Sequence, residues 1–380
     1  MQIAVNTRLL LKGKLEGIGW FTYENLLRIT RQHPEHQFYF LFDRPYCNDF
    51  IFSENITPVV LRPQSRHPVL WYIWFEWSVS RFLRKTKVDV FLSPDGFIPL
   101  RTKTPQIAVI HDINFYHDPQ GLPLLTSWYL NKFFPQFARH ASRVVTVSQF
   151  SKNDIINSYQ VNASKIDVVY NGANSKFQPL TASAAEDVRK ELSDGLPYFV
   201  FVGAFSPRKN VNRLIKAYSI FRDKTNAPVK LVLVGEPMFK TTAIQKAYNQ
   251  SKYKSDIVFA GRKEVESLWK IVGAATAMIY PPLFEGFGIP ILEAMKCDIP
   301  LAVSNTTSMP EVAGNAAIYF DPLDPEEIAN SMMALWSNPD LRLQLVSNAR
   351  IQREKFSWDL AAEKIYRSML EAVKNGQTQS

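Results

Sequence analysis

The chain has 380 residues, 46% hydrophobic and 21% charged, with a formal net charge of +9. This length suggests about two globular domains, and the composition excludes the disordered and fibrous classes. The positive balance suits anionic partners such as phosphate-bearing ligands, nucleic acid or a membrane surface, without choosing among them. The two cysteines, Cys47 and Cys297, lie far apart without metal-like spacing. We therefore expect a cytoplasmic protein with neither a disulfide framework nor a zinc site.

The first five residues enter a strand-like run at once, with no basic segment followed by an apolar one. A secretory signal peptide is therefore not expected. No stretch approaches the ~18 uninterrupted apolar residues that a membrane-spanning helix needs, so no such helix is expected either.

Short apolar runs alternate with longer amphipathic stretches in the first half of the chain. Many of the runs are continuously apolar, which is typical of strands buried on both faces of a parallel sheet. These predicted strands cover residues 3–6, 38–42, 88–93, 107–111, 144–148 and 166–170. Helices are predicted between them, for example over residues 20–31, 70–84 and 149–158.

Small and turn-forming residues at 178–183 interrupt this rhythm, and we interpret them as a linker. The rhythm then restarts, and a last helix is predicted from Trp358 to Lys374 with Ser357 as its N-cap. Two successive series of strands and helices predict an α/β protein with two doubly wound, Rossmann-like domains. The second series of predicted strands covers residues 198–202, 230–234, 257–260, 277–280, 301–304 and 317–320.

A glycine and two cations follow the first strand of the second series. Gly203 comes directly after this strand, and Arg208 and Lys209 stand just before an amphipathic helix. The helix start offers free N–H groups, Arg208 a bidentate fork and Lys209 a point charge, which together predict a cradle for a diphosphate. The alternative is an ordinary turn with two solvated cations.

Two glutamates and two glycines follow the strand that ends at residue 280. Gly286 and Gly288, on either side of Phe287, let the backbone approach a ligand closely and leave helix N-terminal amides exposed. Glu285 lies in the loop and Glu293 inside the next helix, about 12 Å further along at 1.5 Å per residue. They are thus too far apart for a carboxylate dyad, and we expect them to hold opposite ends of an elongated ligand. For Glu293 alone, a surface or N-cap role is the alternative.

The first domain offers fewer candidates. Gly13, Gly17 and Gly19 form a permissive loop after the first strand, but their spacing does not match G-x-G-x-x-G. His111 and Asp112 end a strand, where ligands bind in open parallel sheets, although a structural histidine is the alternative. No D-x-D, H-E-x-x-H or His/Cys cluster indicates a metal. Charge on a leaving phosphate must then be neutralised by protein cations and helix ends, and no metal or cofactor is expected.

With these residues the chain resembles the family 4 glycosyltransferases, which have the GT-B fold of two Rossmann-like domains facing each other across a cleft. The resemblance covers nearly the whole chain. It rests on motifs in the family's order, namely Gly17-Ile18-Gly19, His111-Asp112, residues 145–151, Gly203 with Arg208-Lys209-Asn210, and the E-x7-E element from Glu285 to Glu293. We assign residues 1–175, with the C-terminal helix 357–380, to an acceptor-binding domain and residues 176–356 to a donor-binding domain.

The resemblance implies a role for each motif of the second domain. Arg208 and Lys209 would neutralise the donor diphosphate as the bond breaks. Glu285, with the amides of Gly286, Phe287 and Gly288, would hold the donor sugar hydroxyls. Glu293 would bind the ribose hydroxyls.

In the first domain, the resemblance places His111 beside the transferred sugar and lets Gly17 and Gly19 close over the phosphates. The family's reaction retains the anomeric configuration without a metal, and is drawn as front-face attack in which the leaving phosphate helps to deprotonate the acceptor. The Gly-Phe-Gly-Ile-Pro and His-Asp-Ile-Asn-Phe segments look most like bacterial mannosyltransferases of surface polysaccharide and lipopolysaccharide assembly. This implies GDP-mannose as donor, with UDP-sugars as the alternative, a glycan or lipid-linked acceptor, and no nucleic acid partner.

Two other classes remain as alternatives. A GT-B sugar-nucleotide epimerase shares the architecture but is disfavoured by the E-x7-E element. A non-catalytic sugar or anionic-lipid binding module would not need both the cationic and the glutamate motifs. Separately, the aromatic segment at residues 70–77, followed by Arg81, Arg84, Lys85 and Lys87, is either a packed helix or a peripheral contact with an anionic membrane.

Overall fold

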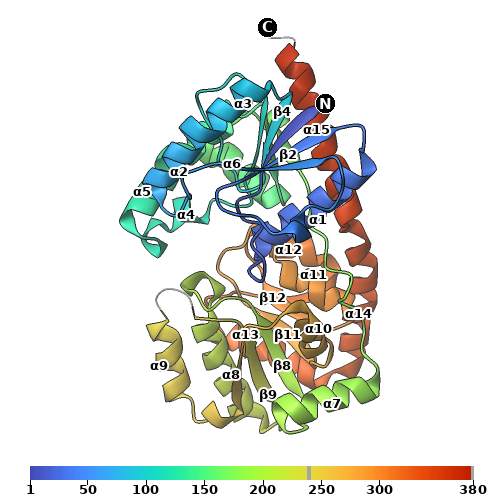
Figure 1. Ribbon diagram of the computed structural model, residues 1–380. Helices are drawn as coiled ribbons and strands as arrows, with labels where there is room; N and C mark the ends of the chain where they lie inside the picture. The colour runs from blue at the N-terminus through green and yellow to red at the C-terminus, as the bar shows by residue number, and fades with distance from the viewer. Residues whose placement is uncertain (238–240, 378–380) are drawn as a thin grey trace. The chain divides into compact units, whose positions relative to one another are not determined.

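The computed structural model describes residues 1–237 and 241–377 and divides into two compact units (Figure 1). The first unit comprises residues 1–171 and the segment from 357 onward, and the second comprises residues 172–356. The boundary between the units thus falls directly after Asn171, whereas the sequence predicted it between residues 175 and 176. The expected linker at 178–183 lies within the second unit, and its last two residues already belong to a helix.

The first unit is built on a seven-stranded parallel sheet with strand order β3-β2-β1-β4-β5-β6-β7. β3 was not predicted from the sequence. It is an edge strand with a proline and several partly exposed residues, so it lacks the continuous apolar run of its neighbours. The strands are β1 (Gln2–Asn6), β2 (Gln37–Phe42), β3 (Ile56–Val60), β4 (Val90–Ser93), β5 (Gln106–Val109), β6 (Arg143–Thr146) and β7 (Ile166–Val168).

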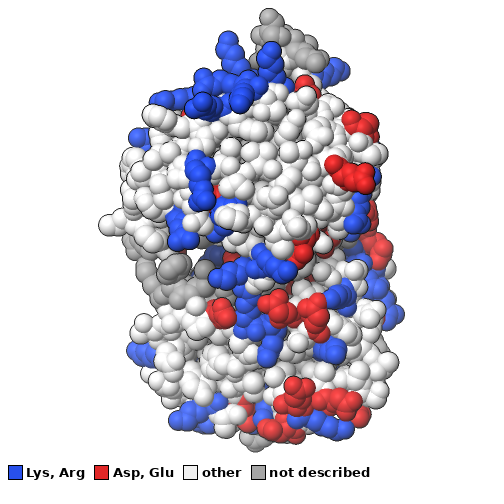
Figure 2. Space-filling view, viewed as in Figure 1, with Lys and Arg blue, Asp and Glu red and all other residues white. Residues whose placement is uncertain are grey.

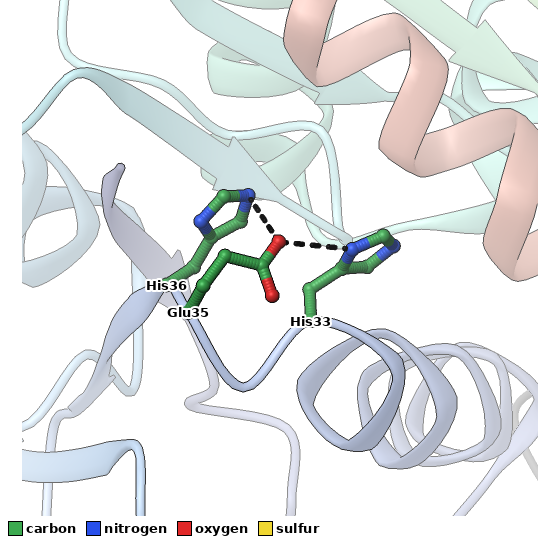
Figure 3. A group of neighbouring side chains, drawn as sticks. All are labelled: His33, Glu35 and His36. Atoms are coloured by element: carbon green, nitrogen blue, oxygen red, sulfur yellow. Dashed lines mark ion pairs between the residues drawn. The ribbon is translucent and has the colours of Figure 1, made fainter.

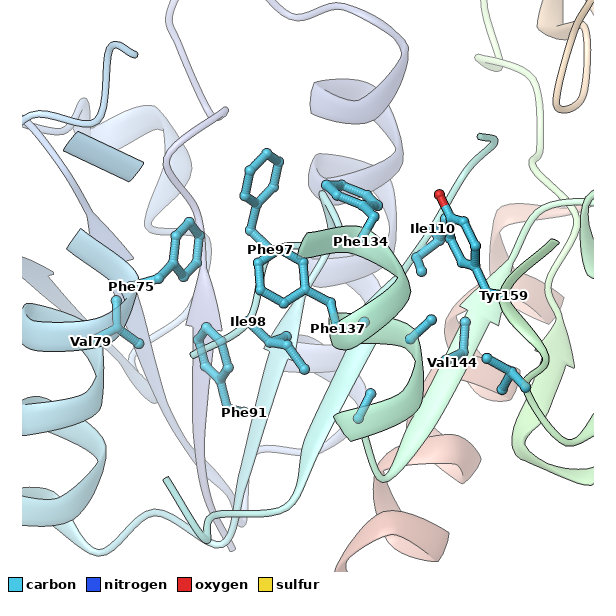
Figure 4. Close-up of a cluster of buried hydrophobic side chains, with 14 of the residues drawn as sticks. Phe75, Val79, Phe91, Phe97, Ile98, Ile110, Phe134, Phe137, Val144 and Tyr159 are labelled. Carbon is cyan, nitrogen blue, oxygen red and sulfur yellow. The ribbon is translucent and has the colours of Figure 1, made fainter. Parts of the chain in front are cut away.

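Helices cover both faces of this sheet (Figures 1 and 4). The predicted helix over residues 70–84 is present, but a π-helical segment interrupts it. The helices are α1 (Gly17–Gln32), α2 (Pro68–Ile73), the π-helix η2 (Trp74–Val79), α3 (Ser80–Thr86), α4 (Asn114–His117), α5 (Leu124–His140), α6 (Gln149–Tyr159) and α15 (Trp358–Gln377), with 3₁₀ turns η1 (Asn48–Phe50), η3 (Pro119–Gly121) and η4 (Ala163–Lys165).

An aromatic core fills the space between the sheet and helices η2 and α5 (Figure 4). Phe97 lies at its centre, with its ring centroid 5.6 Å from that of Phe75 and 5.1 Å from that of Phe134. The guanidinium of Arg8 lies 4.4 Å from the Phe97 ring centroid, and its Nε donates to Asp95 at 2.6 Å. A buried ion pair therefore borders the apolar core at the carboxyl ends of β1 and β4. The cation–π contact with Phe97 stabilises the charge of Arg8 further.

The C-terminal helix α15 belongs to the first unit, where it packs against α1 and the central strands. Asp359 near its start forms an ion pair with Arg28 of α1, with 2.7 Å between Arg28 Nε and the carboxylate. One face of the helix is fully covered. Its buried apolar residues are Trp358, Ala361, Ala362, Ile365, Met369 and Ala372.

The second unit is a six-stranded parallel sheet with strand order β10-β9-β8-β11-β12-β13. All of its strands except β10 have the bounds expected from the sequence, and β10 is one residue longer. The strands are β8 (Tyr198–Val202), β9 (Lys230–Val234), β10 (Ile257–Gly261), β11 (Ala277–Tyr280), β12 (Leu301–Ser304) and β13 (Ala317–Phe320).

Helices flank this second sheet as well (Figure 1). They are α7 (Ala182–Ser193), α8 (Val211–Thr225), α9 (Thr242–Gln250), α10 (Val265–Gly273), α11 (Ile289–Lys296), α12 (Met309–Ala313), α13 (Pro325–Ser337) and α14 (Pro339–Gln352), with 3₁₀ turns η5 (Pro207–Lys209), η6 (Lys254–Asp256), η7 (Gly314–Ala316) and η8 (Arg353–Lys355). From β8 the chain proceeds to one side of the sheet, and from β11 to the other. The strand order therefore reverses between β8 and β11, where ligands bind in doubly wound sheets.

Candidate active site

The two motifs predicted in the second domain meet at this reversal point. Turn η5, which carries Arg208 and Lys209, follows β8, and the loop with Glu285 follows the neighbouring strand β11. Because both strands are parallel, their carboxyl ends lie at the same edge of the sheet. The topology thus brings residues 77 positions apart in sequence into contact.

Glu285 forms ion pairs with both cations. Arg208 pairs with the Glu285 carboxylate and also donates to the Phe284 carbonyl at 3.0 Å. The Lys209 ammonium lies 2.5 Å from Glu285 Oε1 and donates to the Tyr280 hydroxyl at 2.6 Å. Glu285 and Lys209 are each 8% exposed. Lys209 is therefore a buried, paired cation, whereas the Arg208 side chain is 34% exposed and is held by its pairing with Glu285.

The cations determine the charge of Glu285. Burial alone would raise its pKa, but the positive charges of Arg208 and Lys209 and their hydrogen bonds outweigh burial and lower it. The carboxylate is therefore ionised at neutral pH. Burial, followed by the charge of Glu285, raises the pKa of Tyr280 well above its ordinary value, so the Tyr280 hydroxyl stays neutral.

Glu293 lies in helix α11 in a different environment. Its side chain is half-buried, and its carboxylate has neither an ion pair nor a hydrogen bond within residues 1–237 and 241–377. Burial raises the pKa of Glu293 to about 8. The pKa values of the two glutamates of the E-x7-E element are therefore shifted in opposite directions, which their spacing does not reveal.

The glycine loop before α11 is conformationally constrained. Gly288 has φ +92°, and a Cβ there would lie 2.7 Å from the Met309 methyl carbon, so the position requires glycine. Phe287 is 3% exposed and packs edge-on against Phe356, with ring centroids 5.6 Å apart. Its side chain is thus part of the core. Gly203 lies beside the aliphatic stem of Lys209, whose Cε would be 3.6 Å from a Cβ at position 203.

His111 lies two residues beyond β5 in the first unit and is half-buried. Its Nε2 lies 2.9 Å from the carbonyl oxygen of Pro94, and its ring is edge-on to Phe21. Because a carbonyl accepts hydrogen bonds but cannot donate them, Nε2 carries the proton and Nδ1 the lone pair. Burial lowers the pKa of His111. The side chain is therefore a neutral hydrogen-bond acceptor through Nδ1.

The prediction of a glycine loop at Gly17 and Gly19 is wrong in its local structure. Helix α1 begins at Gly17, so both glycines lie in its first turn. A Cβ on Gly19 would lie 3.2 Å from the Leu9 carbonyl oxygen, whereas the space around Gly17 is open. Close packing of Gly19 against the preceding loop extends the helix despite the low helix propensity of glycine.

The structure also assembles a group of possible metal ligands that the sequence reading missed (Figure 3). Glu35 Oε1 lies 3.4 Å from a ring nitrogen of both His33 and His36. The ring nitrogens of His36 also contact the amino group of Met1 at 3.1 Å and the Tyr366 hydroxyl at 2.9 Å. This cluster lies at the amino end of β2, at the edge of the sheet opposite to His111. It joins the α1–β2 turn to α15 and is not part of the candidate site.

Comparison with known proteins agrees with this geometry. The chain matches a model described as Glycosyltransferase Family 4 over residues 17–177 and one described as Glycosyl transferases group 1 over residues 183–352. Together with two parallel-sheet units and paired cations at a strand-order reversal, these matches define a glycosyltransferase with the GT-B fold. The first part of the chain is thus similar to glycosyltransferase family 4 and the second part to the glycosyl transferases of group 1.

Two relatives of this chain are named as O-antigen chain mannosyltransferases. It is 28% identical to O-antigen chain mannosyltransferase B of Escherichia coli over 278 residues, which cover 73% of each chain. It is 26% identical to O-antigen chain mannosyltransferase RfbU of Salmonella typhimurium over 287 residues, 75% of this chain and 76% of that one.

Solved structures share its fold at lower identity. HepE of Anabaena in complex with UDP and glucose matches with a TM-score of 0.73 and 17% identity, covering 96% of this chain and 98% of HepE. WaaG, a glycosyltransferase involved in lipopolysaccharide biosynthesis, matches with a TM-score of 0.72 and 16% identity, covering 96% and 98%.

Proposed function

We propose that this chain transfers mannose from GDP-mannose, with retention and without a metal, to a glycan or lipid-linked acceptor in surface-polysaccharide assembly. The observation that carries the proposal is the ion-paired group of Glu285, Arg208 and Lys209 at the reversal point of the second sheet. The names of the relatives, which describe O-antigen mannosyltransferases, support the choice of sugar and acceptor.

In the free protein, Glu285 forms ion pairs with both Arg208 and Lys209. A donor diphosphate is an anion that competes for the same partners, with two negative charges in place of one carboxylate. Once the diphosphate pairs with Arg208 and Lys209, Glu285 can accept hydrogen bonds from the sugar hydroxyls. The cations then lie where negative charge grows as the glycosidic bond to phosphate breaks, which lowers the barrier without a metal.

The remaining candidates complete the donor site in this proposal. The backbone amides of Gly286, Phe287 and Gly288 face the sugar, and Glu293 accepts hydrogen bonds from the ribose hydroxyls. His111, neutral and with its lone pair on Nδ1, accepts a hydrogen bond from a sugar hydroxyl. Gly17 and Gly19, in the first turn of α1, approach the phosphates.

Paired substitutions test this proposal. We expect Lys209→Ala and Glu285→Ala to fold and to lose mannose transfer by about a hundredfold or more, as expected for groups that stabilise transition-state charge. Lys190→Ala removes an exposed cation on α7 and serves as a control that keeps activity. Unchanged turnover in both site variants would refute the assignment.

The donor has one specific alternative. A structure of HepE was determined with UDP-glucose, and its fold matches this chain with a TM-score of 0.73. A thermal-shift screen against GDP-mannose, UDP-glucose and other sugar nucleotides separates the two, because a ligand that binds the native state raises the unfolding temperature by mass action. Stabilisation by UDP-sugars but not by GDP-mannose would replace the donor and leave the mechanism intact.

None of the helices within the described residues combines the length and apolar character needed to cross a membrane. We further propose peripheral contact of a cytoplasmic enzyme with an anionic membrane through helices α2, η2 and α3. The segment has two faces: Trp74 and Phe75 are buried, whereas Trp77 is 64% exposed. Figure 2 shows Lys and Arg side chains gathered at the end of the first unit where α3 lies, and those that α3 and the residue after it expose are Arg81, Arg84, Lys85 and Lys87.

Co-sedimentation with vesicles tests the membrane contact. Binding to vesicles that contain phosphatidylserine is expected to weaken with salt, because exposed charges are screened. Trp77→Ala should weaken binding without changing stability, since the indole is largely in solvent. Equal binding to neutral and anionic vesicles would contradict the electrostatic part of the proposal.

A further inference from the structure

Tyr280 contacts the Lys209 side chain through its hydroxyl group. It is the last residue of β11, is fully buried, and accepts a hydrogen bond from the Lys209 ammonium at 2.6 Å. Its ring stacks on Phe201 of the neighbouring strand β8, with centroids 6.0 Å apart and planes 24° from parallel. The ammonium also lies 5.1 Å from the Tyr280 ring centroid. Two adjacent strands therefore fix the position of this hydroxyl.

The partners of Lys209 differ in what a ligand can do to them. Glu285 lies in a loop at the sheet edge and, in the proposed function, exchanges its cations for sugar hydroxyls. Tyr280 is enclosed by the sheet, so no ligand can take its place beside the ammonium. Its hydroxyl is neutral, so it holds Lys209 without cancelling the positive charge that a diphosphate needs.

We propose that Tyr280 is a positioning residue that keeps the Lys209 ammonium in place while Glu285 releases it to the donor diphosphate. A lysine side chain has a flexible stem of four carbon atoms, so an acceptor in a fixed position restricts how far its charge can move when the carboxylate departs. The Tyr280 hydroxyl limits this movement and orients the ammonium before the bond to the leaving phosphate breaks. This inference rests on the proposed function for its catalytic consequence, but not for the contact itself.

Tyr280→Phe tests the proposal with minimal disturbance, because it keeps the ring that stacks on Phe201 and removes the hydroxyl. Tyr198→Phe is a matched control. Tyr198 is equally buried, begins strand β8 of the same sheet, and donates its hydroxyl to the Ile271 carbonyl at 2.6 Å, away from the site.

With GDP-mannose as donor, we expect Tyr280→Phe to lower kcat by about tenfold, with a smaller effect on KM, because the lost contact matters most as charge develops on the leaving group. In a Lys209→Ala background, the same substitution should cost nothing further, since its effect acts through the lysine. A kcat equal to that of Tyr198→Phe, at equal thermal stability, would overturn the positioning role. A merely structural tyrosine would lower the unfolding temperature and leave kcat per folded molecule unchanged.

A second measurement does not depend on the donor. Competitive labelling with acetic anhydride, read by mass spectrometry, reports the reactivity of the Lys209 amine. Removal of the Tyr280 hydroxyl takes a hydrogen bond from the charged form, so labelling of Lys209 should rise by about threefold or more over the Tyr198→Phe control. Unchanged labelling would refute the contact. Labelling that rises in a protein that turns over no sugar nucleotide would refute the proposed function and leave the contact standing.

Discussion

Replacing Glu293 with Gln tests whether burial alone controls this carboxylate. Burial raises its pKa from 4.5 to about 8, so the folded protein binds a proton that the unfolded chain has released. Stability from this group is then complete below pH 4.5 and is lost as pH rises through about 8. The difference between the two pKa values would correspond to about 5 kcal/mol if it were fully expressed. Because Glu293 is only half-buried, we expect about 2 kcal/mol.

The assay is urea denaturation of the wild type and Glu293→Gln at about pH 5 and about pH 9, with the free energy of unfolding extrapolated to water. Gln keeps the shape and cannot ionise, so its stability should change less with pH. We expect the wild type to lose about 2 kcal/mol relative to Glu293→Gln between these two conditions. Glu191→Gln, at an exposed position on α7, is the control and should follow the wild type. Parallel stabilities of wild type and Glu293→Gln at both pH values would refute the reasoning.

Other substitutions test the strained backbone at Gly288, the buried ion pair of Asp95 and the packing of Trp74. Gly288→Ala forces a side chain into φ +92° and should cost about 1–3 kcal/mol in urea denaturation, whereas Gly17→Ala, in open space at a helix start, should cost nothing; equal losses would contradict the strain argument. Asp95→Ala leaves the buried Arg8 uncompensated and should cost about 3–5 kcal/mol, and a loss below about 1 kcal/mol would show that the pair is solvated. Trp74→Ala empties a fully buried site and should cost about 3–5 kcal/mol, measured as a lower midpoint of denaturation; an unchanged midpoint would show that the core collapses around the gap.

Much of the second unit was predictable because its strands are continuously apolar and bounded by turn residues. Strands β8 and β11 have the bounds predicted from the sequence, because all of their residues are hydrophobic and buried. β3 was missed because Pro58 and partly exposed neighbours give an edge strand no continuous run. The start of α1 was missed because glycine propensity argued against a helix that packing against the preceding loop stabilises.

The candidate residues could be predicted from the sequence, whereas the contacts between them could not. Arg208, Lys209 and Glu285 could be named from strand ends, but their ion pairs depend on β8 and β11 being neighbours, which strand order in the sheet decides. Tyr280 reads as one more apolar strand residue, and no local signal marks its hydroxyl as the partner of Lys209. The opposite pKa shifts of Glu285 and Glu293 likewise follow from their three-dimensional surroundings rather than from their spacing.

The return of α15 to the first unit sets an order for synthesis. Residues 172–356 form one uninterrupted unit, so this unit can close as soon as it leaves the ribosome. The first unit, although made earlier, lacks the helix that covers its central strands until residues after 357 emerge. The apolar surface that Ile365 and Met369 later cover is therefore exposed throughout translation of the second unit. The half of the protein that is made first is in this sense the last to be finished, and it is the half on which chaperones have most reason to act.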